Sequence, residues 1–124
     1  MIHIDTHVAI WLAERRAAAL STTAQRLIDR EELQISPMVG MELETLGQAG
    51  KLRSEPDRVL AVLERDHGVT RSQTTFDLVI EAARTFAWTR DPFDRLIVAN
   101  AMADRVRLLT ADELILRHFK DAVW

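Results

Sequence analysis

The chain of 124 residues contains no cysteine. That absence excludes disulfide bonds, thiolate zinc sites and cysteine nucleophiles, and it fits a reducing compartment. Lysine is scarce as well: only Lys51 and Lys120 occur among 16 basic residues, so nearly all of the positive charge is arginine. Arginine favours bidentate phosphate contacts, but the net charge of −3 is not that of a general nucleic-acid binder. A polyanion would have to bind through a local arginine patch or together with a divalent cation.

Long apolar runs are also missing, and none approaches the roughly 20 residues that a membrane-spanning helix needs. The opening segment MIHIDTHVAIWLAERR has no basic start, and Asp5 and His7 interrupt its apolar stretch, so it does not match a signal peptide. There is no internal repeat, no low-complexity tract, and no GxGxxG or Walker-type lysine motif. We therefore expect a cytoplasmic protein without a membrane partner.

The composition is that of an ordinary globular domain, with 48% hydrophobic and 28% charged residues. A chain of this length can bury roughly two-thirds of the surface that its unfolded form exposes. The only linker-like stretch, residues 47–57, is too short to separate two domains and is expected to join two helices. We expect one domain that spans residues 1–124.

Short apolar segments alternate with longer amphipathic ones along the chain. This alternation predicts strands covered by helices on both faces of a parallel sheet. The expected fold class is α/β: a three-layer α/β/α sandwich with a small, mainly parallel sheet of four to five strands. The expected strands are residues 1–5, 33–36, 69–72, 106–110 and 122–124, and the expected helices are residues 6–16, 21–32, 37–50, 56–68, 75–88, 92–105 and 112–119.

The segment TRDPFDRLIVANA (Thr89–Ala101) places two aspartates around a Pro-Phe pair before an apolar run. Asp91 is suited to cap the helix that Pro92 begins, with Asp94 in its first turn. The same two carboxylates are also suited to bind a metal ion. The positions of the other acids in the chain bear on this choice.

Three further acids follow strands. Asp5 ends the first strand, Glu42 lies in the second turn after the strand 33–36, and Asp112 follows the strand 106–110. Because the carboxyl ends of parallel strands meet at one edge of the sheet, these side chains are expected to converge there. Asp94 can join them if its helix starts at that edge.

A cluster of carboxylates repels itself and is stable when a divalent cation binds to it. Oxygen ligands favour Mg²⁺ or Mn²⁺ over zinc or copper. Such an ion activates water and neutralises charge on a phosphate ester, so the residues alone point to a metal-dependent phosphodiesterase or nuclease. Structural roles stay open: Asp5 can cap the first helix, Asp112 can stabilise the last one, with Thr110 and Glu113 forming a capping box, and Glu42 can be a solvated helix residue.

The histidines are weaker candidates. His3 alternates with isoleucines in a strand, which is typical of a buried structural residue, whereas His7 can reach the edge of the site. Ser36 is suited to cap the next helix, although its position at a strand end also places it near the expected site.

Three segments together resemble the PIN-domain family, and specifically its VapC-type ribonuclease toxins: IDTHVAIWL, ISPMVGMELETLGQAGKL and TRDPFDRLIVANAMADRVRLLTAD. The last is the most specific, and the resemblance spans nearly the whole chain. It implies the α/β/α fold already expected. It also implies that the four matching acids, Asp5, Glu42, Asp94 and Asp112, are catalytic and bind one or two Mg²⁺ or Mn²⁺ ions.

The resemblance implies partners too. They are an RNA substrate, a small antitoxin protein that blocks the active site, a second copy in a homodimer, and DNA only indirectly through the antitoxin. Related proteins often have histidine where this chain has Thr89, which leaves the role of that position open. We expect the following residues to contact substrate or flank the site: Thr6, Ser36, Arg90, Arg95 and Thr110, with Arg15 or Arg16 as further phosphate contacts and Asp91 as a helix cap.

Two other classes compete with this interpretation. A phosphoacceptor receiver domain would need paired acids near the first strand and a lysine after the strand 106–110, and the chain has neither. A PIN-like module that binds RNA or protein without catalysis would be expected to have lost some of the four acids, and all four are present.

Overall fold

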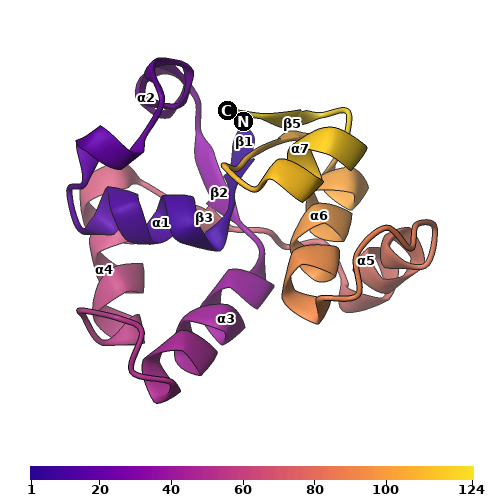
Figure 1. The fold of residues 1–124 in the computed structure, drawn as a ribbon, viewed down its shortest axis with the longest axis horizontal. Coiled ribbons are helices and arrows are strands. Elements are labelled where there is room, and N and C mark those ends of the chain that lie inside the picture. The colour runs from indigo at the N-terminus through magenta and orange to yellow at the C-terminus, as the bar shows by residue number, and fades with distance from the viewer.

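The computed structural model describes residues 1–124 and contains a five-stranded sheet with seven α-helices around it (Figure 1). All pairings between neighbouring strands are parallel, and the strand order is β3-β2-β1-β4-β5. The expected α/β/α sandwich is confirmed, with a sheet that is entirely parallel. The strands are β1 (Ile2–Ile4), β2 (Leu33–Ile35), β3 (Thr70–Arg71), β4 (Arg107–Leu109) and β5 (Ala122–Val123).

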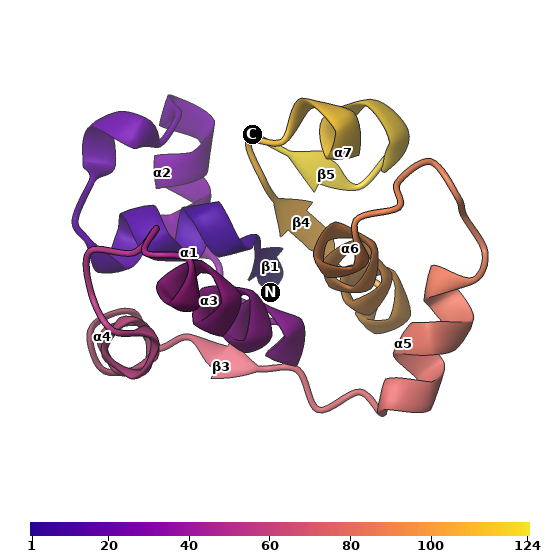
Figure 2. The same cartoon turned by 60° about the horizontal axis from the view of Figure 1, so that its bottom comes forward.

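The helices lie in two layers. Connections between parallel strands are right-handed, so those that run toward one edge of the sheet cross one face and those that run toward the other edge cross the opposite face. Figure 2 shows the sheet between α1, α3 and α4 on one side and α5 and α6 on the other. The helices are α1 (Thr6–Ala13), α2 (Thr22–Arg30), α3 (Pro37–Gln48), α4 (Pro56–His67), α5 (Phe76–Ala83), α6 (Pro92–Asp104) and α7 (Glu113–His118), with a 3₁₀ turn at Ala17–Ala19. No helix combines the length and the apolar character needed to cross a bilayer.

Two helices end earlier than the sequence pattern predicts. α1 stops at Ala13, and Arg15 then takes a left-handed conformation (φ 56°) that no helix continues through. α5 stops at Ala83 instead of continuing to Trp88. Beyond it, the Phe86 and Trp88 rings stack on each other with centroids 5.2 Å apart.

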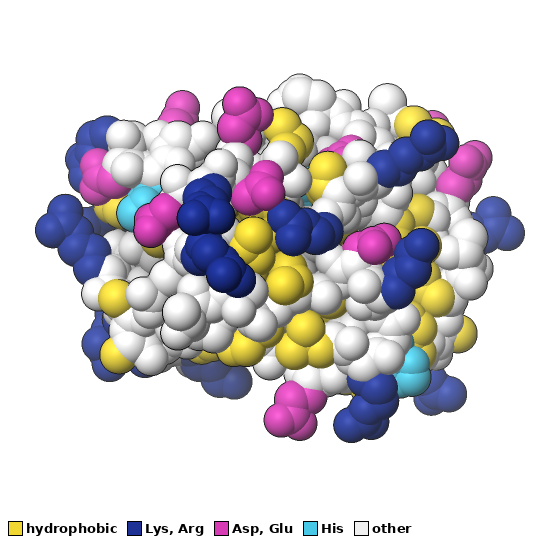
Figure 3. All heavy atoms as spheres, turned by 90° about the horizontal axis from the view of Figure 1, so that it is seen from above, with side chains coloured by type: hydrophobic (Ala, Val, Ile, Leu, Met, Phe, Trp, Pro, Cys, Tyr) yellow, Lys and Arg dark blue, Asp and Glu magenta, His cyan; other side chains and the backbone are white.

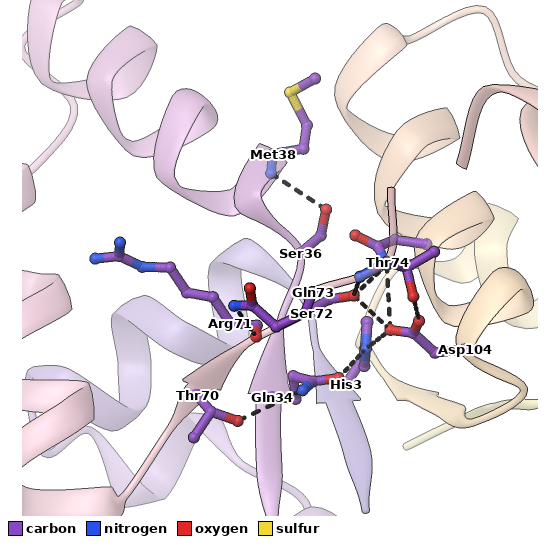
Figure 4. Close-up of polar contacts among 11 residues, drawn as sticks. His3, Gln34, Ser36, Met38, Thr70, Arg71, Ser72, Gln73, Thr74 and Asp104 are labelled. Carbon is purple, nitrogen blue, oxygen red and sulfur yellow. Dashed lines mark hydrogen bonds and ion pairs between the residues drawn. The ribbon is translucent and has the colours of Figure 1, made fainter. Parts of the chain in front are cut away.

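The core forms around β1, which is buried on both faces. Ile2 and Ile4 belong to a cluster of 22 buried hydrophobic residues, and His3 between them is fully buried as well. His3 Nε2 lies 2.7 Å from Asp104 Oδ2 of α6 and 2.9 Å from Gln34 Oε1 of β2 (Figure 4). Ser72 Oγ donates to the same aspartate at 2.7 Å. Burial lowers the pKa of His3, although both of its neighbours act to raise it. His3 is therefore the structural residue that its strand position predicts.

The side of the molecule on which both chain ends lie carries interspersed charges around a central exposed hydrophobic patch (Figure 3). Here the N-terminal ammonium lies 2.9 Å from Glu31 Oε2, and Arg107 Nη2 donates to Glu31 Oε1 at 2.8 Å. The ammonium is the main reason that the pKa of Glu31 is lowered. This side has no field of a single sign, in agreement with the small net charge.

The strand order changes direction between β1 and β4, which are neighbours in the sheet but far apart in the sequence. The chain leaves these two strands toward opposite faces, and a crevice opens beyond their carboxyl ends, where α/β proteins bind ligands. The backbone is tied together at this point, since Asp5 N donates to Leu109 O at 3.0 Å.

Candidate active site

The crevice beyond β1 and β4 is a cleft of about 380 Å³ that brings the four predicted acids together with a fifth. They arrive from four different elements: the end of β1, the second turn of α3, the start of α6 and the start of α7. The residues that line the cleft are Asp5, His7, Trp11, Glu42, Asp91, Asp94, Ala111 and Asp112. The convergence predicted from topology is therefore observed, and the functional role of these acids stays a prediction.

Asp5 is fixed at the end of β1 by hydrogen bonds to both of its oxygens. Oδ1 accepts from Thr6 N at 2.7 Å and so caps α1, while Oδ2 accepts from Thr110 Oγ1 at 2.6 Å. Burial raises the pKa of Asp5, and these two hydrogen bonds oppose the rise. Capping and a place in the cleft are thus combined in one side chain, whereas the sequence presented them as alternatives.

Thr110 connects the two acids that flank the strand pair. Its hydroxyl donates to Asp5 and accepts from Asp112 N at 3.1 Å. Asp112 in turn caps α7, because its Oδ1 accepts from Ile115 N at 2.9 Å. Thr6 and Thr110 are both fully buried, and their expected contact with substrate stays a prediction. From below the cleft, Thr110 orients the carboxylate of Asp5 and holds the backbone at Asp112.

The start of α6 separates the roles of its two aspartates as the sequence suggests. Asp91 Oδ1 accepts from Phe93 N at 2.8 Å and from Asp94 N at 3.2 Å, so Asp91 is the cap of a helix that begins with proline. Thr89 Oγ1 accepts from Asp91 N at 3.3 Å and steadies the entry to this turn. Asp94, half-buried, then lies in the first turn with its carboxyl in the cleft.

The electrostatics of the cleft are seen most clearly at Asp94, whose pKa is raised to about 7. Burial is the largest cause, and the negative charges of Asp91, Asp5, Asp112 and Glu42 all add to it. Each acid is therefore close enough to make the ionisation of Asp94 unfavourable, which is how a cluster of like charges behaves without a counter-ion.

Glu42 completes the cleft from α3. Ser36 and Pro37 set the start of this helix, with Ser36 Oγ accepting from Met38 N at 3.2 Å. Burial is the largest cause that raises the pKa of Glu42; the neighbouring Thr6 hydroxyl opposes the rise and Asp5 adds to it. Ser36 itself is buried and lines a different groove beside Met38, and its expected contact with substrate stays a prediction.

The predicted phosphate contacts are mostly committed elsewhere. Arg95 donates through Nε to Ala83 O at 2.9 Å and through Nη2 to Phe86 O, and its guanidinium lies 5.7 Å from the Phe86 ring centroid. Arg95 therefore holds the end of α5 against α6, and its expected contact with phosphate stays a prediction. Arg90 is exposed at the entry to α6 and stays a candidate.

Arg15 and Arg16 lie beyond the carboxyl end of α1, whereas the acids surround its amino end. Arg16 Nη1 is 3.4 Å from Glu14 Oε2, and Arg15 lines a separate pocket with Arg58 and Arg65. The helix therefore separates both arginines from the cleft, and their expected contact with substrate phosphate stays a prediction.

Aromatic side chains form part of the cleft that sequence reasoning missed. Trp11 lines it together with His7, and the two ring centroids are 6.0 Å apart. The signal was available in the spacing, since residues four apart share one face of a helix. His7 had been expected at the edge of the site, and Trp11 follows from its place one turn later.

The oxygen donors of the cleft are chemically suited to a hard divalent cation, because they are carboxylate oxygens. The buried Oγ1 of Thr6, beside Asp5, has no hydrogen-bond partner. As the side chains stand, no three His, Asp or Glu residues are grouped tightly enough to hold an ion. The residues fit a cation by type and charge, and the carboxylates are spread around the cleft as mutual repulsion requires.

A parallel α/β/α sandwich with carboxylates gathered at the reversal of strand order is the architecture of the class that the sequence resembles. The sequence model of the PIN-domain family matches residues 2–120, so the chain belongs to that family. Members of the family are generally nucleases. Among solved structures, the fold is similar to a chain of the VapBC2 complex from Rickettsia felis bound to a DNA fragment from its promoter. That similarity has a TM-score of 0.68 at 16% identity and covers 99% of this chain and 96% of the other. A search among curated proteins found no match.

Proposed function

We propose that the protein is a metal-dependent endoribonuclease that acts as the toxin of a toxin–antitoxin pair. The observation that carries this proposal is the acid cleft: five carboxylates from four elements meet at the switch point of the sheet, and burial together with the charges of the other four raises the pKa of Asp94 to about 7. Such a concentration of like charge destabilises the fold unless it serves a cation. Membership of the PIN-domain family supports the nuclease assignment.

Asp5, Glu42, Asp94 and Asp112 would hold one or two Mg²⁺ or Mn²⁺ ions, directly or through water. When bound, the cation supplies an activated water and neutralises charge on the scissile phosphodiester. The chain's own residues prepare this arrangement. Thr110 holds Oδ2 of Asp5 in a fixed position, and Asp91 fixes the first turn of α6 so that Asp94 points into the cleft. Asp94 would lose its proton on binding a cation, because the positive charge would offset the repulsion from the neighbouring carboxylates.

A basic partner protein would complement the acid cleft and thereby block it. The VapBC2 complex contains a toxin and an antitoxin on promoter DNA, and its likeness in fold supports an antitoxin partner for this chain, with DNA contacted only through that partner. We further propose that the chain forms a homodimer and acts in the cytoplasm.

The test is cleavage of RNA by the purified protein. We expect no cleavage in chelator, and cleavage after addition of Mg²⁺ or Mn²⁺. Asp5→Asn and Asp94→Asn should both be inactive at saturating metal, while Arg58→Gln, a change in a surface pocket away from the cleft, should cleave like the parent. Equal rates for the parent and the two aspartate variants would refute the proposal. Sequencing of RNA ends after induced expression identifies the target.

One observation favours an alternative, a PIN-like module that binds RNA or protein without catalysis: no three acidic or histidine side chains are grouped tightly enough to hold an ion as they stand. Calorimetric titration with Mn²⁺ discriminates between the two. An inactive module should show no specific binding, whereas an enzyme should bind one or two ions per chain, and binding should be lost in Asp5→Asn.

A further inference from the structure

We propose that Trp11 and His7 form a nucleobase-stacking subsite for a nucleotide that flanks the cleaved bond. The inference deepens the proposed ribonuclease function and rests on it. It concerns the part of the cleft that the carboxylates leave unexplained, namely its aromatic wall. Neither side chain is one of the four acids proposed to hold the cation.

The aromatic wall is built from one helix face. His7 and Trp11 are four residues apart in α1 and lie on the same side of it, and both line the cleft whose floor begins at Asp5, the cap of that helix. Trp124, which follows β5, packs against Trp11 with ring centroids 5.9 Å apart. The wall is therefore fixed beside the acids by the same helix that Asp5 caps.

The His7 and Trp11 rings of this wall are not stacked on one another, and Trp11 is not stacked on Trp124 either. Trp11 meets His7 at an interplanar angle of 52° and Trp124 at 53°. By contrast, Trp88 lies nearly parallel to both Phe86 and His118, at 19° and 12°, with centroids 5.2 Å away in each case. Trp88 already has its stacking partners, whereas Trp11 has only tilted neighbours and borders open space.

A nucleic-acid substrate explains an aromatic wall next to a cation site. The carboxylates would bind the phosphate through a cation. The base of the same or the next nucleotide would then lie against a neighbouring surface. Proteins commonly recognise single-stranded RNA by stacking its unpaired bases on Trp, Phe, Tyr or His rings. Because every base has a π-face, such a platform tolerates any sequence and gains affinity from each stacked base. The inferred ligand is therefore an unpaired nucleobase of single-stranded RNA.

The experiment compares oligoribonucleotides with a base, or an abasic residue, at each of the two positions that flank the cleaved bond. Trp11→Leu keeps an apolar, helix-compatible side chain and removes the ring. For the parent, we expect the abasic substrate at one position to lower kcat/KM on the order of tenfold. Trp11→Leu should lose this preference, Trp11→Phe should keep most of it, and Trp124→Leu, a tryptophan outside the cleft lining, should leave it unchanged.

The possible failures are distinguishable. If Trp11→Leu cleaves RNA and retains the parent's ratio between base and abasic substrates, the subsite is refuted while the ribonuclease function stands, and the aromatic wall is left to a protein partner. If the parent neither binds nor cleaves RNA with Mg²⁺ or Mn²⁺, both the function and the subsite are refuted. A loss of the ratio in Trp124→Leu equal to that in Trp11→Leu would show that general repacking, and not stacking, is responsible.

Discussion

The hydroxyl of Thr110 donates a 2.6 Å hydrogen bond to Oδ2 of Asp5, across 105 residues of sequence. It joins the carboxyl ends of β4 and β1, the two strands between which the sheet order reverses. The Thr110 hydroxyl oxygen also accepts a hydrogen bond from Asp112 N. One buried hydroxyl therefore sets the positions of two acids in the cleft. The geometry of the candidate active site therefore depends on a buried residue beneath the cleft.

Thr110→Val is predicted to weaken both the fold and the site. Valine has the same shape but leaves Oδ2 of buried Asp5 without its donor, which costs about 1–3 kcal/mol of unfolding free energy. Loss of the bond also raises the pKa of Asp5 further, because that bond opposes the effect of burial. Mn²⁺ affinity measured at pH 7 should fall. Thr110→Ser keeps the hydroxyl and should behave like the parent; an equal loss in both variants would contradict the role of the bond.

The two aspartates at the start of α6 are predicted to respond differently to replacement by asparagine. Asp94→Asn should abolish cleavage. Asp91→Asn should fold normally, since Asn caps helices as well as Asp. It also removes the charge that, after burial, contributes most to the raised pKa of Asp94. The pH–rate profile of Asp91→Asn should therefore move to lower pH at subsaturating Mn²⁺, where the cation and the proton compete for Asp94. An unshifted profile, or inactivity of both variants, would contradict this division of roles.

The metal-free protein is predicted to lose stability as pH rises from about 4 to about 7. In this range the folded state keeps a proton on Asp94, whose pKa is raised from 3.8 to about 7, and the unfolded state does not. The state that binds more protons is disfavoured as pH rises, so unfolding becomes easier. The pKa values of Asp5 and Glu42 are raised too and act in the same direction, whereas the lowered pKa of His3 acts oppositely.

Urea unfolding in chelator at several pH values measures this effect, with Asp94→Asn as the reference that carries His3 unchanged. The variant should lose less stability than the parent between pH 5 and pH 7, and added Mn²⁺ should stabilise the parent most at the high end. A parent and a variant with the same dependence on pH would show that Asp94 ionises normally.

The two arginines of the segment TRDPFDR are predicted to act through different physical effects. Arg95→Gln removes the clasp on Ala83 and Phe86 and should cost about 2 kcal/mol of unfolding free energy, while the salt dependence of RNA binding stays as in the parent. Arg90→Gln, at an exposed position, should leave stability unchanged and reduce the salt slope by about one. Binding measured over a series of KCl concentrations separates the two. A reduced slope for Arg95→Gln would identify it as a phosphate contact.

The layers, the parallel sheet and the convergence of the acids followed from the sequence because they depend on local rules. Alternating apolar segments predict the strands and helices, and parallel strands place Asp5 and Asp112 at one edge whatever the distances are. The cap at Asp91 followed in the same way, since it involves only the next three residues.

What could not be predicted depends on contacts between distant segments. Arg95 looked like a free cation in the sequence, and only the path of the chain after α5 brings two carbonyl oxygens to it. The burial of Thr110 beneath Asp5 is a tertiary property that its sequence position does not reveal. Its place at the end of a strand therefore suggested a substrate contact.

We propose above all that the acid cleft binds the divalent cation that cleavage requires. The most direct test of this proposal is the anomalous difference density of crystals grown with Mn²⁺, recorded for the parent and for Asp94→Asn. We predict a peak in the parent within coordination distance of Asp5 and Asp94, and a weakened or absent peak in the variant. A fully occupied Mn²⁺ outside the cleft, with no density among the acids in crystals of a protein that cleaves RNA, would contradict the account.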